Sequence, residues 1–357
     1  MHTRVVVYVV GLLVVTALAA VVGWRVLGTR TTYEQALDKL PKATLRTTYT
    51  DWSHIREQAD GSSLGDGASE DDIGAFLNRA YDLDLTSGSA VSDSTYAMMK
   101  HYGFSPLDAQ WEALGQSPGG QVDVLRLDDD VDLPGIERTL RRLGYTPPKD
   151  GSGEGGTWGG GADLVASIDG GLTPLQQNFV VLPDERLVLM SDSSSYVAAA
   201  AKVAEGSSPS VVDVDGIEEL ASAADSPVTA VQWTSTFACE DLSMGETDDE
   251  DQRVGEELVA EAGEISPLDG LVMAQQADRS LVVGMHFESS DQASSNLQPR
   301  VDLASGEAPG QGGTFDERFS IASAEADDQD VVLTLEPRSY DPLLSDISSG
   351  PVLFATC

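Results

Sequence analysis

The order of strand-like and helix-like segments is the feature of this sequence that most limits its fold. Residues 178–203, 271–297 and 319–347 each read as strand, polar turn, strand and then helix. Hairpins that alternate with single helices form antiparallel sheets covered by helices. We therefore expect an α+β fold, a largely antiparallel sheet of hairpin–helix units with helices on one face. Two similar halves, meeting near residues 205–226, are an option that rests on element order and not on residue identity.

Helix signals and breakers divide the rest of the chain. Ser69 and three following acids are typical of a helix start, while Gly103 and Gly144 are typical of helix ends. We predict a cytoplasmic tail (1–4), a transmembrane anchor or signal peptide (5–27), a juxtamembrane stalk (28–50), a mostly helical subdomain (51–120), a first α+β half (121–205) and a second (206–357).

The segment Val5–Trp24 contains no charged residue over 20 positions. As a helix it would be about 30 Å long, the thickness of the hydrocarbon core of a bilayer. The alternative is a cleaved signal peptide, because Arg4 precedes the apolar run and Ala17-Leu18-Ala19 matches a cleavage site. We expect an uncleaved single-pass anchor; cleavage at Ala19 would instead give a secreted protein.

Orientation follows from two conflicting signals. Basic residues are more frequent just after the apolar segment than before it, which favours a cytoplasmic body. Large domains are translocated largely regardless of such charges, and the layout resembles an export signal. We therefore expect the large C-terminal domain to be extracytoplasmic.

The charge balance excludes one class of partner. The chain has 21 Lys and Arg against 59 Asp and Glu, a net charge of −38. Such a surface repels nucleic-acid phosphates, so we expect no nucleic-acid partner. Dispersed carboxylates also keep a protein hydrated, which needs no ligand at all.

Two cysteines, Cys239 and Cys357, each follow a strand-like run. In an exported protein this predicts one disulfide that joins the C-terminus to the middle of the sheet. No CxxC motif is present, so the sequence gives no sign of a cysteine-built redox or zinc site.

Two glycine motifs match enzyme patterns but lack the required context. Gly151–Gly156 spells G-x-G-x-x-G, yet a helix end precedes it and no helix follows it directly. Gly61–Gly65 spells G-x-S-x-G inside a polar loop without the strand that a nucleophile elbow needs. We expect no cofactor at the first and no nucleophile at the second. Trp158, bracketed by glycines, is a candidate exposed contact for a partner or a sugar; the alternative, which is more common for tryptophan, is a ring folded back onto the core.

The remaining polar candidates are histidines and acidic clusters. His101 and His286 are the candidates for a general base if the protein is a hydrolase. Three acidic clusters (Asp128–Asp130 with Asp132, Asp248–Asp251, and Asp327-Asp328 with Asp330) offer oxygen ligands for calcium, but none has an EF-hand pattern. Helix starts and turns explain these clusters better than a metal site does, so we expect no metal site.

These observations predict a membrane-anchored envelope protein that binds a partner protein or an extracellular ligand without catalysis. The alternatives are an exported hydrolase and a calcium-dependent surface protein. The sequence does not determine the ligand, the partner or the oligomeric state.

Overall fold

The computed structural model describes residues 30–65, 67–149, 156–339 and 342–357. Thr32–Cys357 form one compact unit. The expected anchor Val5–Trp24 lies outside the described residues, as do residues 151–155 of the glycine motif. Within the described ranges, no helix combines the length and the apolar character needed to cross a bilayer.

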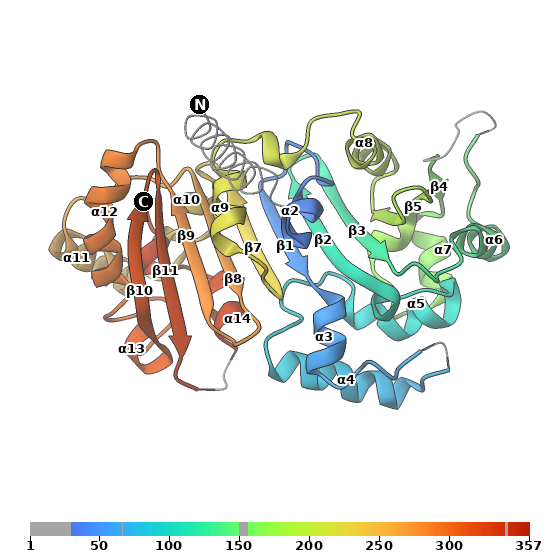
Figure 1. Ribbon diagram of the computed structural model, residues 1–357, viewed down its shortest axis with the longest axis horizontal. Helices are drawn as coiled ribbons and strands as arrows, with labels where there is room; N and C mark the ends of the chain where they lie inside the picture. The colour runs from blue at the N-terminus through green and yellow to red at the C-terminus, as the bar shows by residue number, and fades with distance from the viewer. Residues whose placement is uncertain (1–29, 66, 150–155, 340–341) are drawn as a thin grey trace, which may run out of the picture. The chain divides into compact units, whose positions relative to one another are not determined.

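All the strands of the described chain belong to one antiparallel sheet, which runs across Figure 1 in the order β10-β11-β9-β8-β7-β1-β2-β3-β6-β5-β4. The strands are β1 (Arg46–Thr50), β2 (Ala109–Ser117), β3 (Gly120–Leu127), β4 (Trp158–Gly159), β5 (Asn178–Leu182), β6 (Leu187–Ser191), β7 (Thr229–Thr234), β8 (Gly270–Gln275), β9 (Leu281–His286), β10 (Phe319–Asp327) and β11 (Asp330–Pro337).

Two runs of this sheet have the same strand order. From the centre outward, one run is β1-β2-β3-β6-β5 and the other is β7-β8-β9-β11-β10. In both runs, the first strand pairs with a hairpin (β2-β3 or β8-β9). The later strand of a second hairpin (β6 of β5-β6, or β11 of β10-β11) then pairs with the far strand of the first hairpin. β1 and β7 are antiparallel neighbours, so an approximate two-fold axis at the centre of the sheet relates the two runs. A helix precedes each first strand, α2 before β1 and α9 before β7.

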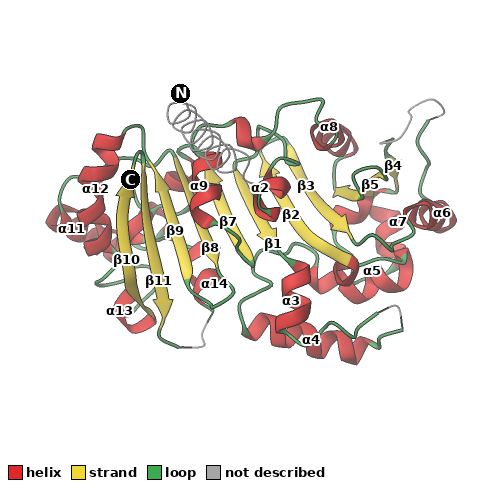
Figure 2. Ribbon diagram, in the orientation of Figure 1, coloured by secondary structure: helices red, strands yellow, loops and turns green. Residues whose placement is uncertain are grey.

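Helices cover both faces of the sheet, so the expectation of helices on one face is wrong (Figure 2). Strands such as β5 and β8 are buried along their whole length, which requires cover on both sides. The helices are α2 (Thr32–Leu37), α3 (Trp52–Gln58), α4 (Glu70–Asp82), α5 (Thr95–Tyr102), α6 (Leu133–Leu143), α7 (Gly161–Ile168), α8 (Ser194–Ala204), α9 (Ile217–Ala224), α10 (Phe237–Asp241), α11 (Asp249–Ala262), α12 (Ser290–Leu303), α13 (Phe315–Arg318) and α14 (Leu343–Ser348).

The helix ends follow the local signals of the sequence. Ser69 caps α4 and forms a capping box with Asp72, which satisfies backbone groups at the start of the helix. Gly103 and Gly144 end α5 and α6 in the left-handed conformation, with φ of 77° and 100°. Glycine adopts this conformation without a Cβ clash, so both predicted ends are confirmed.

Apolar side chains form three clusters. On the face that carries Arg46, the first cluster packs β2, β3, β5 and β6 against α3–α7, and the second packs β7–β11 against α10–α14. On the opposite face, the third cluster packs the centre of the sheet against α2, α8 and α9. The predicted subdomain 51–120 contains α3–α5 and also β2, which joins the sheet next to β1. The division at residues 120 and 205 stays a prediction.

β1 separates the first cluster from the second. Its sequence is RTTYT, and Arg46, Thr48 and Thr50 point to the same face because side chains alternate along a strand. Tyr49 points to the other face and belongs to the third cluster. We call the line of Arg46, Thr48 and Thr50 the polar seam. It lies between two apolar clusters on one face of a continuous sheet.

Candidate functional site

The two histidines proposed as general bases each hydrogen-bond to a carboxylate. Nε2 of His101 is 2.9 Å from Asp169 Oδ2, and Nδ1 of His286 is 2.6 Å from Asp330 Oδ1. The hydrogen bond that the imidazole donates to Asp330 raises the pKa of His286. Backbone N–H donation from Gly171, followed by the contact with His101, lowers the pKa of Asp169.

Neither pair forms a triad in the part of the chain that the structure describes, since no serine hydroxyl there hydrogen-bonds to either imidazole. The His286 side chain is 4% exposed, and its ring packs so closely on Gly216 that a Cβ there would lie 2.5 Å from the ring carbon Cγ. His286 therefore joins two strands and a helix start. His101, 23% exposed, ties α5 to the loop after α7.

Trp158 is 2% exposed, so the hypothesis that it is an exposed contact is wrong. It lies in β4 opposite Phe179 and belongs to the first cluster. The Arg141 guanidinium covers its ring at 5.2 Å from the centroid. The flanking glycines favoured exposure in the sequence, but a large ring contributes more free energy when it is buried than when it projects into water.

The three acidic clusters lie where helix starts and turns need them. Asp132 caps α6 by accepting one backbone N–H, and Asp248 caps α11 by accepting two. Asp327–Asp330 form the turn between β10 and β11, with Asp328 at φ 49°. Among the described residues, no three His, Cys, Asp or Glu side chains are grouped so as to hold a metal ion.

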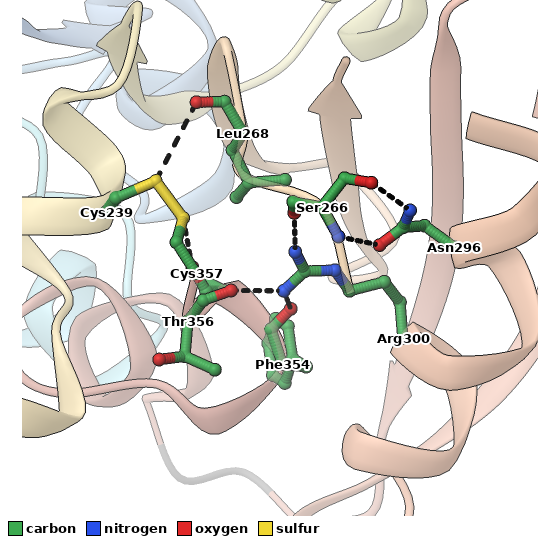
Figure 3. Close-up of a disulfide and its surroundings, with 9 residues drawn as sticks. Cys239, Ser266, Leu268, Asn296, Arg300, Phe354, Thr356 and Cys357 are labelled. Atoms are coloured by element: carbon green, nitrogen blue, oxygen red, sulfur yellow. Dashed lines mark hydrogen bonds between the residues drawn. A yellow bond between two sulfur atoms is a disulfide. The ribbon is translucent and has the colours of Figure 1, made fainter. Parts of the chain in front are cut away.

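Cys239 and Cys357 form the predicted disulfide, with Cα atoms 5.5 Å apart (Figure 3). Cys239 lies on α10 and Cys357 is the last residue. The C-terminal segment is also held by Arg300 of α12, whose guanidinium donates to the carbonyl oxygens of Phe354 at 2.9 Å, Thr356 at 2.5 Å and Ser266 at 2.7 Å. Arg300 is fully buried, and desolvation lowers its pKa to about 10.

A groove of about 640 Å³ opens at the Arg46 end of the polar seam. Its size falls within the range of small-ligand sites. The walls come from four separate parts of the chain: the start of β1, the end of β2, α10 and the end of α14. The lining residues are Leu45, Arg46, Gln116, Ser117, Pro118, Phe237, Asp241, Ser348 and Ser349.

Arg46 is the central polar group of the groove. Its Nη1 donates to Gln116 Oε1 at 3.2 Å, and its guanidinium lies 5.7 Å from the centroid of the Trp233 ring. Its Nε is 3.8 Å from Asp241 Oδ2, too far for a hydrogen bond, and has no acceptor among the described residues. Asp241 Oδ2 instead accepts from the Trp233 indole at 2.6 Å.

These contacts leave Arg46 able to bind an anion. Partial burial lowers its pKa, but an arginine stays protonated at neutral pH. Its side chain is 28% exposed, so part of the guanidinium can reach a ligand in the groove. A carboxylate that reaches the exposed part of the guanidinium would form charge-assisted hydrogen bonds, which are stronger than neutral ones.

The disulfide and the groove share α10. Phe237 and Asp241 are the first and last residues of this helix, and Cys239 lies between them. A five-residue helix has little stability of its own. The disulfide to Cys357 and the hydrogen bond from the Trp233 indole to Asp241 therefore fix this wall of the groove.

Sequence reasoning missed two buried acids, Glu112 on β2 beside the seam and Asp123 on β3, one strand further from it. Glu112 accepts from Trp52 Nε1 at 2.8 Å and Ser89 Oγ at 2.7 Å, whereas neither oxygen of Asp123 has a hydrogen-bond partner among the described residues. Burial, and then repulsion from Glu112, raises the pKa of Asp123 well above its usual value. The available signal was an acid within each of two apolar strands, "WEAL" and "VDVL".

The comparisons with known proteins assign no family. No protein-family model and no curated protein matches the sequence. A solved structure described as crystal form I of TP0453 aligns with 89% of this chain and 98% of that chain, at 7% identity and a TM-score of 0.38. A TM-score this low does not establish a shared fold.

Proposed function

We propose that this protein is a membrane-anchored, extracytoplasmic binding protein and that the groove beside Arg46 is its binding site. The observation that supports binding is the groove itself. It combines a concave surface, a partly exposed arginine, and an aromatic ring, Phe237, in its wall. Sites of this composition orient a ligand by a few polar contacts and hold it by apolar ones.

Two further features support the location. The uncharged run Val5–Trp24 is long enough to span a bilayer. The disulfide between Cys239 and Cys357 is of the kind that persists in oxidising compartments outside the cytoplasm.

Labelling of a new surface cysteine tests the location. Tyr81 is 65% exposed on α4, and both native cysteines are paired, so Tyr81→Cys adds one free thiol. We expect a membrane-impermeant maleimide to label this variant in intact spheroplasts without lysis. Wild-type protein, which should stay unlabelled, is the control. Labelling that appears only after lysis would place the domain in the cytoplasm and refute the location.

Photo-crosslinking tests the binding site. A photoreactive residue at the exposed groove position Ser349 should give a discrete adduct in whole envelopes. The same residue at Tyr81, outside the groove, should not. Introducing Arg46→Glu into the Ser349 crosslinking variant should remove the adduct. An adduct that forms equally at both positions, or none at Ser349, would contradict the assignment of the groove.

A further inference from the structure

Because the two matching strand runs are related by an approximate two-fold axis, the position of the groove has an equivalent elsewhere in the sheet. β1 and β7 pair in the register Arg46 with Trp233 and Thr50 with Thr229. Arg46 opens β1 and Thr229 opens β7, so the two residues hold the same place in their runs. The counterpart of the Arg46 end of the seam is therefore the other end, at Thr50 and Thr229.

At that other end, a segment of the chain itself covers the seam. Thr48 Oγ1 donates to the carbonyl oxygen of Gly88. The backbone at Gly88 lies so close that a Cβ there would be 2.6 Å from Thr229 Oγ1 and 3.0 Å from Thr50 Oγ1. The equivalent of the groove is thus filled by a peptide of small residues, Ser87-Gly88-Ser89-Ala90.

A glutamine occupies the same place at both ends. Gln275 of β8 pairs with Thr229, and its amide Nε2 donates to the carbonyl oxygen of Leu83 at 3.0 Å, just before the covering segment. Gln116 of β2 pairs with Arg46 in the corresponding position and lines the groove. Its Oε1 accepts from Arg46, while its Nε2 donates to no acceptor among the described residues.

We propose that the groove binds a short peptide with a free C-terminal carboxylate, which pairs with Arg46 while a peptide carbonyl accepts from Gln116 Nε2. This proposal rests on the proposed function and names the ligand class of the same site. Of the described residues that line the groove, Arg46 is the only base and Asp241 the only acid. A carboxylate that enters the groove can therefore pair only with Arg46, in competition with Asp241 at 3.8 Å, and the net charge of −38 disfavours peptides that carry several carboxylates.

Titration calorimetry on the full-length protein tests the ligand class. The probe is the N-acetylated tetrapeptide Gly-Ser-Ala-Ala as the free acid, and its C-terminal amide is the comparison. We expect the acid to bind about tenfold more tightly, the ratio that one charge-assisted hydrogen bond provides. Arg46→Gln should remove this preference. Arg138→Gln, on the outer surface of α6, should keep it.

A groove-filling variant gives a second, independent result. Ser349→Trp places a large ring in the groove from an exposed position and should abolish binding of both peptides. Equal binding of acid and amide, or binding that survives Ser349→Trp, would overturn the proposal. If neither peptide binds while the adduct at Ser349 still forms, the ligand class is wrong and the binding function stands. If neither peptide binds and no adduct forms at Ser349, the proposed ligand class and the proposed binding function are both wrong.

Discussion

At the scale of single residues, the buried acids Glu112 on β2 and Asp123 on β3 oppose folding at neutral pH. Burial raises the pKa of Glu112, but an indole, a hydroxyl and the backbone N–H of Ala90 donate to this carboxylate and offset part of that rise. Asp123 has no such donors and faces Glu112, so it is the carboxyl that keeps its proton more strongly. Because the pKa of Asp123 is raised in the folded state, the native protein binds more protons than the unfolded chain above about pH 4. Stability must therefore fall as pH rises from there towards the folded pKa.

Replacement of Asp123 by Asn should stabilise the protein. The amide has nearly the same shape and carries no charge, so the free energy of unfolding at pH 7 should rise by about 1–3 kcal/mol. The gain should shrink as pH falls towards 4, where the unfolded chain is protonated as well. Urea unfolding at several pH values measures this, with the exposed Asp130→Asn as control. A gain that does not change with pH would show that charge at Asp123 is not the cause.

At the scale of elements, local signals could be read from the sequence and side-chain placement could not. The helix ends at Ser69, Gly103 and Gly144 were predicted because capping depends on neighbours within one turn. The disulfide was predicted because two cysteines leave one pairing. Trp158 was misplaced because its burial depends on Phe179, a partner that no short-range pattern reveals.

Loss of the disulfide should weaken both stability and the groove. The bond closes a loop of 118 residues and fixes α10, so the Cys239→Ser, Cys357→Ser double variant should lose about 2–5 kcal/mol of unfolding free energy. Arg300 still holds the C-terminal segment, so the fold should survive. Urea unfolding measures the loss, and calorimetry should show weaker binding of the free-acid peptide. Unchanged peptide affinity would mean that α10 is fixed without the bond.

At the scale of the whole molecule, the order of the strands in the sheet could not be predicted from the sequence, and the groove depends on that order. The repeated hairpins and the antiparallel α+β class were readable from periodicity. The pairing of β1 with β7 joins residues about 180 positions apart, and the segment around Arg46 was not recognised as the central strand. The groove depends on that pairing, since β1, β2, α10 and α14 contribute its walls. Cover on both faces was signalled only by the continuous apolar runs of β5 and β8.

The whole sheet should unfold in one transition despite its size. Chains of this length often unfold in steps, and the polar seam separates the first cluster from the second. The third cluster opposes such a division, because it packs Val180 and Leu189 of one run together with Val272 and Ala274 of the other. Backbone pairing between β1 and β7 also crosses the boundary without interruption. We therefore expect tryptophan fluorescence and far-ultraviolet circular dichroism to report the same midpoint in urea.

Two matched core variants distinguish one transition from two. Phe179 in the first cluster and Phe287 in the second are both fully buried, so replacement of either by Ala should cost about 3–5 kcal/mol. If the sheet is one cooperative unit, each variant lowers the same midpoint in both probes. If the seam divides the molecule, Phe179→Ala would shift an early transition and leave a later one in place, and Phe287→Ala would do the reverse. The single shared shift is the expected result, because unfolding one run would expose the third cluster that both runs bury.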